Sequence, residues 1–140
     1  MELRDISEAP PHIRAVINGY AALNRRDFDA AVPTVDEANL CTTRDAIRGR
    51  LEALVRAFSD ITVRNLRAFD LGDGAVAVTF RMTGTNDGPI DADTPPTGRY
   101  FEADMLDYIR FDASGRIVDG RNLSDMGPIN EQLGLRDGTR

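Results

Sequence analysis

The sequence contains no lysine and no tryptophan, and it has a single histidine, His12, and a single cysteine, Cys41. Without lysine no side-chain Schiff base can form, which excludes lysine-dependent aldolases and pyridoxal phosphate enzymes. One histidine and one cysteine exclude the usual zinc sites, so we expect no metal and no cofactor. If the chain is an enzyme, its proton transfers therefore depend on carboxylates, with tyrosine or arginine in support.

All 17 basic residues are arginines, and with 23 acidic residues the formal net charge is −6. A nucleic-acid groove needs clustered positive charge, so we expect no nucleic-acid partner. No apolar run approaches membrane length, which predicts no membrane partner. The lone cysteine cannot form an internal disulfide and favours the cytoplasm. The length predicts a single domain over residues 1–140.

The hydrophobic pattern changes from a helical period to a strand period near residue 60. Apolar residues at helical spacing predict helices over residues 12–24, 27–31 and 44–58. Alternating patterns predict strands over residues 61–71, 75–85, 100–111 and 116–125, followed by a short helix over 128–135. Helices followed by an antiparallel meander indicate the α+β class.

The third predicted strand carries one carboxylate on an otherwise apolar face. Asp107 shares this face with Met105 and Ile109, because side chains alternate along a strand. A carboxylate is costly to bury unless it is paired or retained for chemistry, so Asp107 is a candidate general acid or base. The alternative is a structural aspartate that bonds to a loop or to an arginine.

The fourth predicted strand places Asp119, Arg121 and Asp125 on one face. We expect these residues to line a hollow shared with Asp107. Burial would raise the pKa of such carboxylates, and a nearby arginine would lower it. The alternative is that this strand is exposed and its charges are solvated.

Five short motifs, in order along the chain, resemble those of the SnoaL-like polyketide cyclases. FSDI at 58–61 resembles the family's "FPD" corner, and GTNDGP at 84–89 with PPTGR at 95–99 resembles its "GTHxG…PPTGR". RF at 110–111 with GRIVD at 115–119 resembles its "RF…GKIVE", and Asp125 with QLG at 132–134 resembles its "D…QLG". YAALN at 20–24 with DFD at 27–29 resembles the opening helix pair.

The resemblance implies a cone-shaped α+β barrel of the ketosteroid isomerase and scytalone dehydratase type. N-terminal helices would pack on a curved, mainly antiparallel sheet that encloses an apolar pocket. It also implies a cofactor-independent polyketide cyclase of bacterial secondary metabolism and antibiotic biosynthesis. Such an enzyme closes a ring by intramolecular aldol addition on a small hydrophobic polyketide-like substrate.

In this family the aspartate before "QLG" is the general acid/base, so the resemblance makes Asp125 the first catalytic candidate, ahead of Asp107, which the strand pattern indicates. Asn86 and Arg121 replace a histidine and a tryptophan of the family's motifs. The residues expected to bind substrate are Tyr20, Asn86, Met105, Asp119 and Arg121.

Two other functions remain open. An epoxide hydrolase or epoxide-opening ether cyclase needs an acid and a base, and Asp36 and Asp104 are further candidates for such a pair with Asp107 or Asp125. Two carboxylates that face each other across the pocket would favour epoxide opening, whereas a lone carboxylate near Tyr20 would favour aldol chemistry. The third function is a non-catalytic ligand-binding module.

The second face of the third predicted strand carries Tyr100, Leu106 and Tyr108. On the outside of the sheet these residues would expose apolar area, which predicts a homodimer. The alternative is that helices or loops of the same chain cover them.

Overall fold

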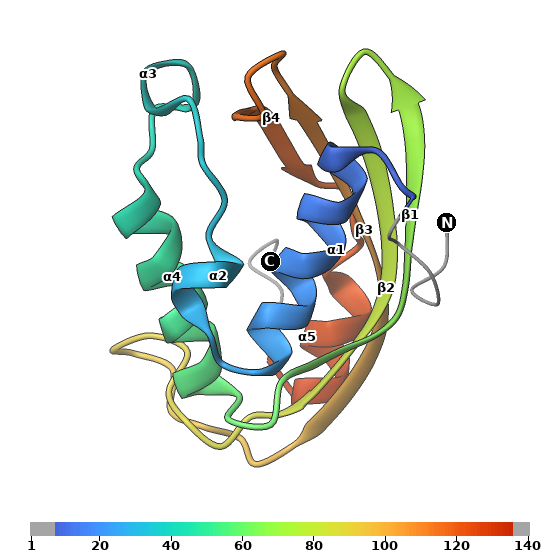
Figure 1. The fold of residues 1–140 in the computed structure, drawn as a ribbon. Coiled ribbons are helices and arrows are strands. Elements are labelled where there is room, and N and C mark those ends of the chain that lie inside the picture. Colours follow the sequence, from blue (N-terminus) through green and yellow to red (C-terminus); the bar gives the residue numbers. More distant parts are fainter. Residues whose placement is uncertain (1–7, 136–140) are drawn as a thin grey trace.

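The computed structural model describes residues 8–135, and in this range helices precede strands (Figure 1). The helices of the first half are α1 (Pro11–Asn24), α2 (Phe28–Ala31), α3 (Glu37–Leu40) and α4 (Arg44–Ala57). The strands are β1 (Thr62–Gly72), β2 (Ala75–Thr85), β3 (Tyr100–Phe111) and β4 (Ile117–Asn122), and α5 (Gly127–Leu133) follows them. The α+β class is confirmed, and α3 lies in a segment for which the pattern predicts no helix.

Short polar side chains set the starts of three helices. Asp27, Asp36 and Thr43 each accept a hydrogen bond from a backbone N–H in the first turn of α2, α3 and α4. Such caps satisfy N–H groups that have no partner within the helix. Helix α1 begins at Pro11 without a side-chain cap. Proline suits this position because its fixed φ is helical and its missing N–H is not needed there.

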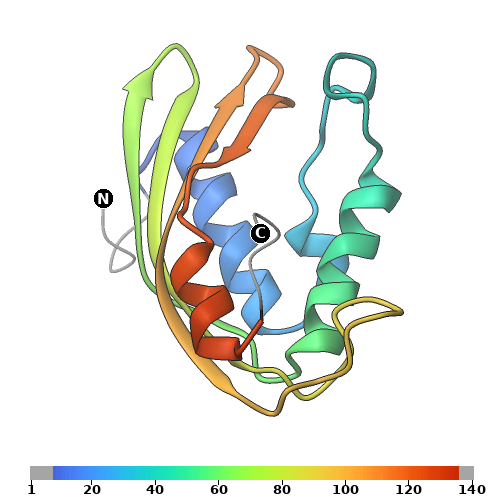
Figure 2. The same ribbon diagram turned by 180° about the vertical axis from the view of Figure 1, so that it is seen from behind.

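The four strands form an antiparallel meander in the order β1-β2-β3-β4. The sheet is curved, and both views place the helices on its inner side, with α1 and α5 against the strands (Figures 1 and 2). Ile13 and Ile17 of α1 are buried in one core with Val76 and Val78 of β2 and Leu133 of α5. This arrangement is the expected helix layer on a curved antiparallel sheet.

β4 contains one extra residue near its start. Ile117 pairs with Phe111 and Asp119 pairs with Arg110, so Val118 has no partner opposite it in the ladder. Such a bulge reverses the face on which all later side chains lie. The prediction that Asp119 and Arg121 share a face with Asp107 is therefore wrong.

β4 also ends at Asn122, three residues before the predicted end. The Ser124 backbone N–H donates to Asn122 Oδ1 at 2.8 Å, and the Leu106 N–H donates to Ser124 Oγ at 2.8 Å. Side-chain oxygens thus take the places of backbone ladder partners, which is a common way to end a strand.

The loop between β2 and β3 is fastened to the end of α4 by Asn86, whose side chain is fully buried. Its Nδ2 donates to the carbonyls of Ala57 (3.1 Å) and Gly88 (2.8 Å), and its Oδ1 accepts from the Thr97 N–H (2.8 Å). Asn86, expected to bind substrate, instead has a structural role in the position where the family motif carries histidine.

Within residues 8–135, no helix is long and apolar enough to cross a membrane.

Candidate active site

An apolar cavity of about 350 Å³, which we call the chamber, lies between helices α1, α2 and α4 and the inner face of the sheet. Helix α4 contributes Ile47, Leu51 and Leu54, which repeat at helical spacing and are only half-buried. In this helix only Ala57 is buried, so its apolar face packs against the core incompletely and leaves part of its surface to line the cavity. The volume is within the usual range for a small-molecule site.

Asp107 and Tyr20 meet inside this cavity. Asp107 lies on the inner face of β3, and Tyr20 lies in the third turn of α1. The Tyr20 hydroxyl donates a hydrogen bond to Asp107 Oδ2. The Tyr20 ring packs against Phe80 with a centroid distance of 5.0 Å, which holds the hydroxyl in place. Both predicted site residues thus form one unit.

The second carboxylate oxygen of Asp107 is unused. Oδ1 is buried and has no hydrogen-bond partner within the described chain. Burial raises the pKa of Asp107, and the hydrogen bond from Tyr20 opposes this rise. Burial and the neighbouring carboxylate raise the pKa of Tyr20, which therefore stays neutral and acts as a donor. Such an oxygen can accept a proton from a ligand.

Asn122 is a site residue that the sequence analysis missed. It pairs with Asp107 across the β3–β4 ladder and lines the same cavity. Because Ser124 donates to its Oδ1, the amide orientation is fixed, and Nδ2 has no partner in the described chain. If the alternation of side chains along β4 is shifted by one residue at the Val118 bulge, the sequence pattern places Asn122 on the same face as Asp107.

The cavity opens into a wider mouth of about 670 Å³ between α3, α4 and β4. Asp107 and Asn122 line both spaces. The mouth is more polar, because Thr42, Arg50 and Arg121 are among the residues that line it. A ligand that fills the cavity therefore has one apolar end and one end among polar groups.

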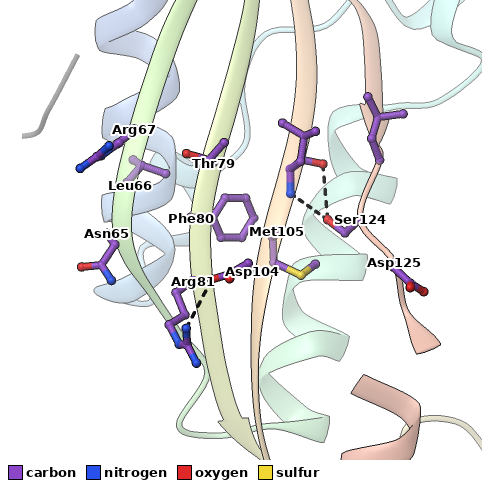
Figure 3. A pocket seen from close by; sticks show the side chains of 12 residues that line it. Asn65, Leu66, Arg67, Thr79, Phe80, Arg81, Asp104, Met105, Ser124 and Asp125 are labelled. Carbon is purple, nitrogen blue, oxygen red and sulfur yellow. Dashed lines mark hydrogen bonds and ion pairs between the residues drawn. The ribbon is translucent and has the colours of Figure 1, made fainter. Parts of the chain in front are cut away.

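Asp125 lies elsewhere, in an open groove of about 890 Å³ on the outer face of the sheet (Figure 3). Its Oδ1 accepts from the Gly127 N–H at 2.9 Å, at the start of α5. Asp104 lines the same groove and pairs with Arg81 at 3.4 Å. Met105 also borders this groove, but it is buried in the core.

Of the remaining predicted residues, Arg121 shares the mouth with Asp107, and Asp36 and Asp119 line neither the cavity nor the mouth. Asp36 caps α3, and its carboxylate lies 3.9 Å from the Arg116 guanidinium. Asp119 forms an ion pair with Arg121 at 3.3 Å on the face opposite to Asp107. Arg121 thus reaches the mouth without reaching the chamber. Of the described residues that line the chamber, Asp107 is the one carboxylate.

The described residues contain no group of three or more histidine, cysteine, aspartate or glutamate side chains placed to hold a metal ion. His12 lies outside the cavity, at the start of α1. Its Nε2 is 3.3 Å from Asp70 Oδ1, and its ring packs against Phe111. Neither His12 nor the exposed Cys41 contacts Asp107 in a described interaction.

Solved structures share this architecture. IdmH from Streptomyces antibioticus, a proposed polyketide cyclase, gives a TM-score of 0.68 at 24% identity and covers 90% of this chain and 100% of its own. AclR from Streptomyces galilaeus, a proposed hydroxylase, gives a TM-score of 0.71 at 20% identity, and the match covers 88% of this chain and 95% of AclR. A proposed polyketide cyclase from Pseudomonas putida gives a TM-score of 0.71 at 16% identity, and the match covers 89% of this chain and 99% of that protein. At these identities the likeness establishes the fold.

A comparison with curated protein sequences gives no match. The family model described as "SnoaL-like polyketide cyclase" matches residues 14–133, from the first helix to the last. This match spans the cavity and every element that builds it. With the shared fold, it establishes that the chain belongs to the SnoaL-like polyketide cyclase family.

Proposed function

We propose that this chain is a polyketide cyclase that closes a ring by aldol addition, with Asp107 as its general acid/base. The observation that carries the proposal is the buried, unpartnered Oδ1 of Asp107 in an apolar cavity. A carboxylate with a raised pKa is suited to take up and return a proton near neutral pH. The family supports this class of substrate, and the proposed role lies in bacterial secondary metabolism.

The reaction begins with the ionised form of Asp107. Oδ1 takes the acidic hydrogen from the carbon between two substrate carbonyls, and the electron pair of that C–H bond passes into an enolate. The enolate carbon attacks an aldehyde or ketone carbonyl of the same molecule and forms the C–C bond. The new alkoxide takes the proton back from Asp107, so no net proton, electron or co-reactant is required.

Two neighbours assist. Asn122 Nδ2 donates a hydrogen bond to the enolate oxygen, because its amide is already oriented by Ser124. A preoriented donor is most effective where charge develops in the transition state. Tyr20 holds Oδ2, which leaves Oδ1 to face the substrate. The folded substrate chain gains further acceleration from being held in a reactive conformation.

The chemistry that needs two carboxylates is less well supported. Epoxide opening requires an acid and a base on opposite sides of the substrate. The described lining of the chamber offers Asp107 alone, whereas Asp36, Asp104 and Asp125 lie outside it. We therefore favour the aldol reaction over epoxide opening.

Hydrogen exchange separates an enzyme from a binding module without knowledge of the natural substrate. The probe is a naphthyl β-keto ester whose central carbon carries one methyl group and one exchangeable hydrogen. In deuterated buffer, the wild type should accelerate loss of that proton signal in the NMR spectrum, and Asp107→Asn should not. Chelator-treated protein should behave as the wild type. Binding of the probe without faster exchange would contradict the proposed catalysis.

A further inference from the structure

The mouth of the cavity carries an arginine that has no acidic partner in the described part of the chain. Arg50 lines the mouth with Thr42 and Arg121, and none of the described ion pairs or hydrogen bonds involves its side chain. In a protein of net charge −6, a free guanidinium at the entrance to the cavity is notable. It presents a positive charge to any ligand that enters.

The other arginines near this entrance are occupied. Arg48 pairs with Asp29 and Glu52, and Arg44 donates to the carbonyls of Pro33 and Val32. The guanidinium of Arg121 pairs with Asp119 at 3.3 Å, which neutralises its charge. Arg50 is therefore the arginine of the described mouth whose charge is left for a ligand.

Its place on α4 directs Arg50 toward the opening. It follows Ile47 by three residues and precedes Leu54 by four, and both of these line the chamber. Residues three and four apart lie on the same side of a helix. Arg50 thus lies beside the apolar stripe of α4, toward the mouth.

We propose that Arg50 binds a carboxylate at the end of the substrate that stays in the mouth. This proposal rests on the proposed function, because the reacting part of the same molecule would lie against Asp107. The chamber is apolar and its one carboxylate repels anions, so a charged end is stabilised outside it. One uncompensated guanidinium matches the single charge and the two oxygens of a carboxylate.

This arrangement sets the direction of the substrate. The ketone-bearing part enters the chamber between Tyr20 and Asn122, and the acid end remains with Arg50. The substrate class is then a free polyketide acid and not its ester. In the alternative, Arg50 is a solvated surface residue and has no influence on which end enters.

The test compares two probes, anthraquinone carboxylate and its methyl ester, by isothermal titration calorimetry at low salt. We expect the wild type to bind the acid about 5- to 10-fold more tightly than the ester, because only the acid can form a charge-assisted contact with Arg50. Arg50→Gln should bind both probes equally. Added salt should reduce the preference of the wild type, because exposed charges are screened.

Arg56→Gln is the matched control. Arg56 lies on the same helix, and its side chain lines none of the described hollows. It follows Ile47 by nine residues, which is two and a half turns, so it lies on the opposite side. This variant loses the same charge as Arg50→Gln and should keep the preference for the acid. Circular dichroism melts would show that both variants are folded.

Equal binding of acid and ester to the wild type would overturn the role of Arg50 and leave the proposed function in place. Equal losses in Arg50→Gln and Arg56→Gln would also overturn it, because net charge alone would then explain the preference. If neither probe binds, the cavity does not accept aromatic polyketide-like ligands, and both proposals fail.

Discussion

Asp107 and Asp125 lie on opposite sides of the sheet, with Asp125 in the segment that follows β4. Asp107 faces the apolar chamber with a buried oxygen that has no partner in the described chain, whereas Asp125 lines the outer groove and bonds to the backbone of α5. The two residues therefore differ in the property that matters for proton transfer, which is contact with a desolvated ligand. We base the proposed mechanism on Asp107 for this reason.

Removal of the Tyr20 hydroxyl tests the coupling inside the chamber. The hydrogen bond from Tyr20 stabilises the ionised form of Asp107 and so lowers its pKa. In Tyr20→Phe this pKa should rise further. Because the base must be ionised, the acid limb of the pH–rate profile should move to higher pH. An unchanged acid limb would show that Tyr20 does not control Asp107.

The ionisation of Asp107 should make the free energy of unfolding decrease as pH rises. Burial raises the pKa of Asp107 above the ordinary value of 3.8, so the folded chain holds this proton more tightly than the unfolded chain. Stability then falls as pH rises from that ordinary value to the raised one. Urea unfolding should show Asp107→Asn gaining stability relative to the wild type across this window. A constant difference across acid and neutral pH would contradict the raised pKa.

Asn86→Ala should destabilise the fold without changing the chemistry. The substitution leaves the Ala57 and Gly88 carbonyls and the Thr97 N–H without their buried amide partner. We expect a loss of about 2–5 kcal/mol in the free energy of unfolding. Asn39→Ala, which removes one exposed hydrogen bond, should cost less than about 1 kcal/mol. Equal costs in urea melts would refute this role of Asn86.

The outer face of the sheet should form a homodimer. Tyr100 (50% exposed), Leu106 (36%) and Leu123 (58%) leave apolar area uncovered, and Tyr108 is half-buried beside them. Light scattering should give twice the chain mass of 15.4 kDa. Leu123→Arg should shift the mass toward one chain, and Leu71→Arg in the β1–β2 hairpin should not. A wild-type mass of one chain at micromolar concentration would exclude the dimer.

The sequence pattern placed Asp107 correctly because β3 pairs with β2 without interruption from Tyr100 to Arg110. The period of two therefore holds along the whole strand. β4 breaks the period at the bulge that follows Ile117, whose backbone bonds to the Thr34 carbonyl and the Asp36 N–H. This contact joins segments about 80 residues apart, and no local pattern contains it. Asn122 was missed for the same reason.

The family motifs show what local pattern can and cannot reveal. Arg99 of the PPTGR motif lies against Gly134 of the QLG motif, so closely that a Cβ on Gly134 would be 2.9 Å from its guanidinium. Gly134 also has a φ of +75°, which favours glycine at a helix end. The two motifs, distant in the sequence, thus contact each other in the folded chain. They do not determine which aspartate faces the chamber.

The most direct test of the account is the hydrogen-exchange rate of Asp107→Asn beside that of Asp125→Asn, with the naphthyl β-keto ester as substrate. Both changes remove one carboxylate and nearly preserve its shape. We predict that Asp107→Asn loses about 100- to 10,000-fold in rate, while Asp125→Asn keeps the wild-type rate and loses about 1 kcal/mol of stability at most. The opposite pattern, with Asp125→Asn inactive and Asp107→Asn fully active, would contradict the account.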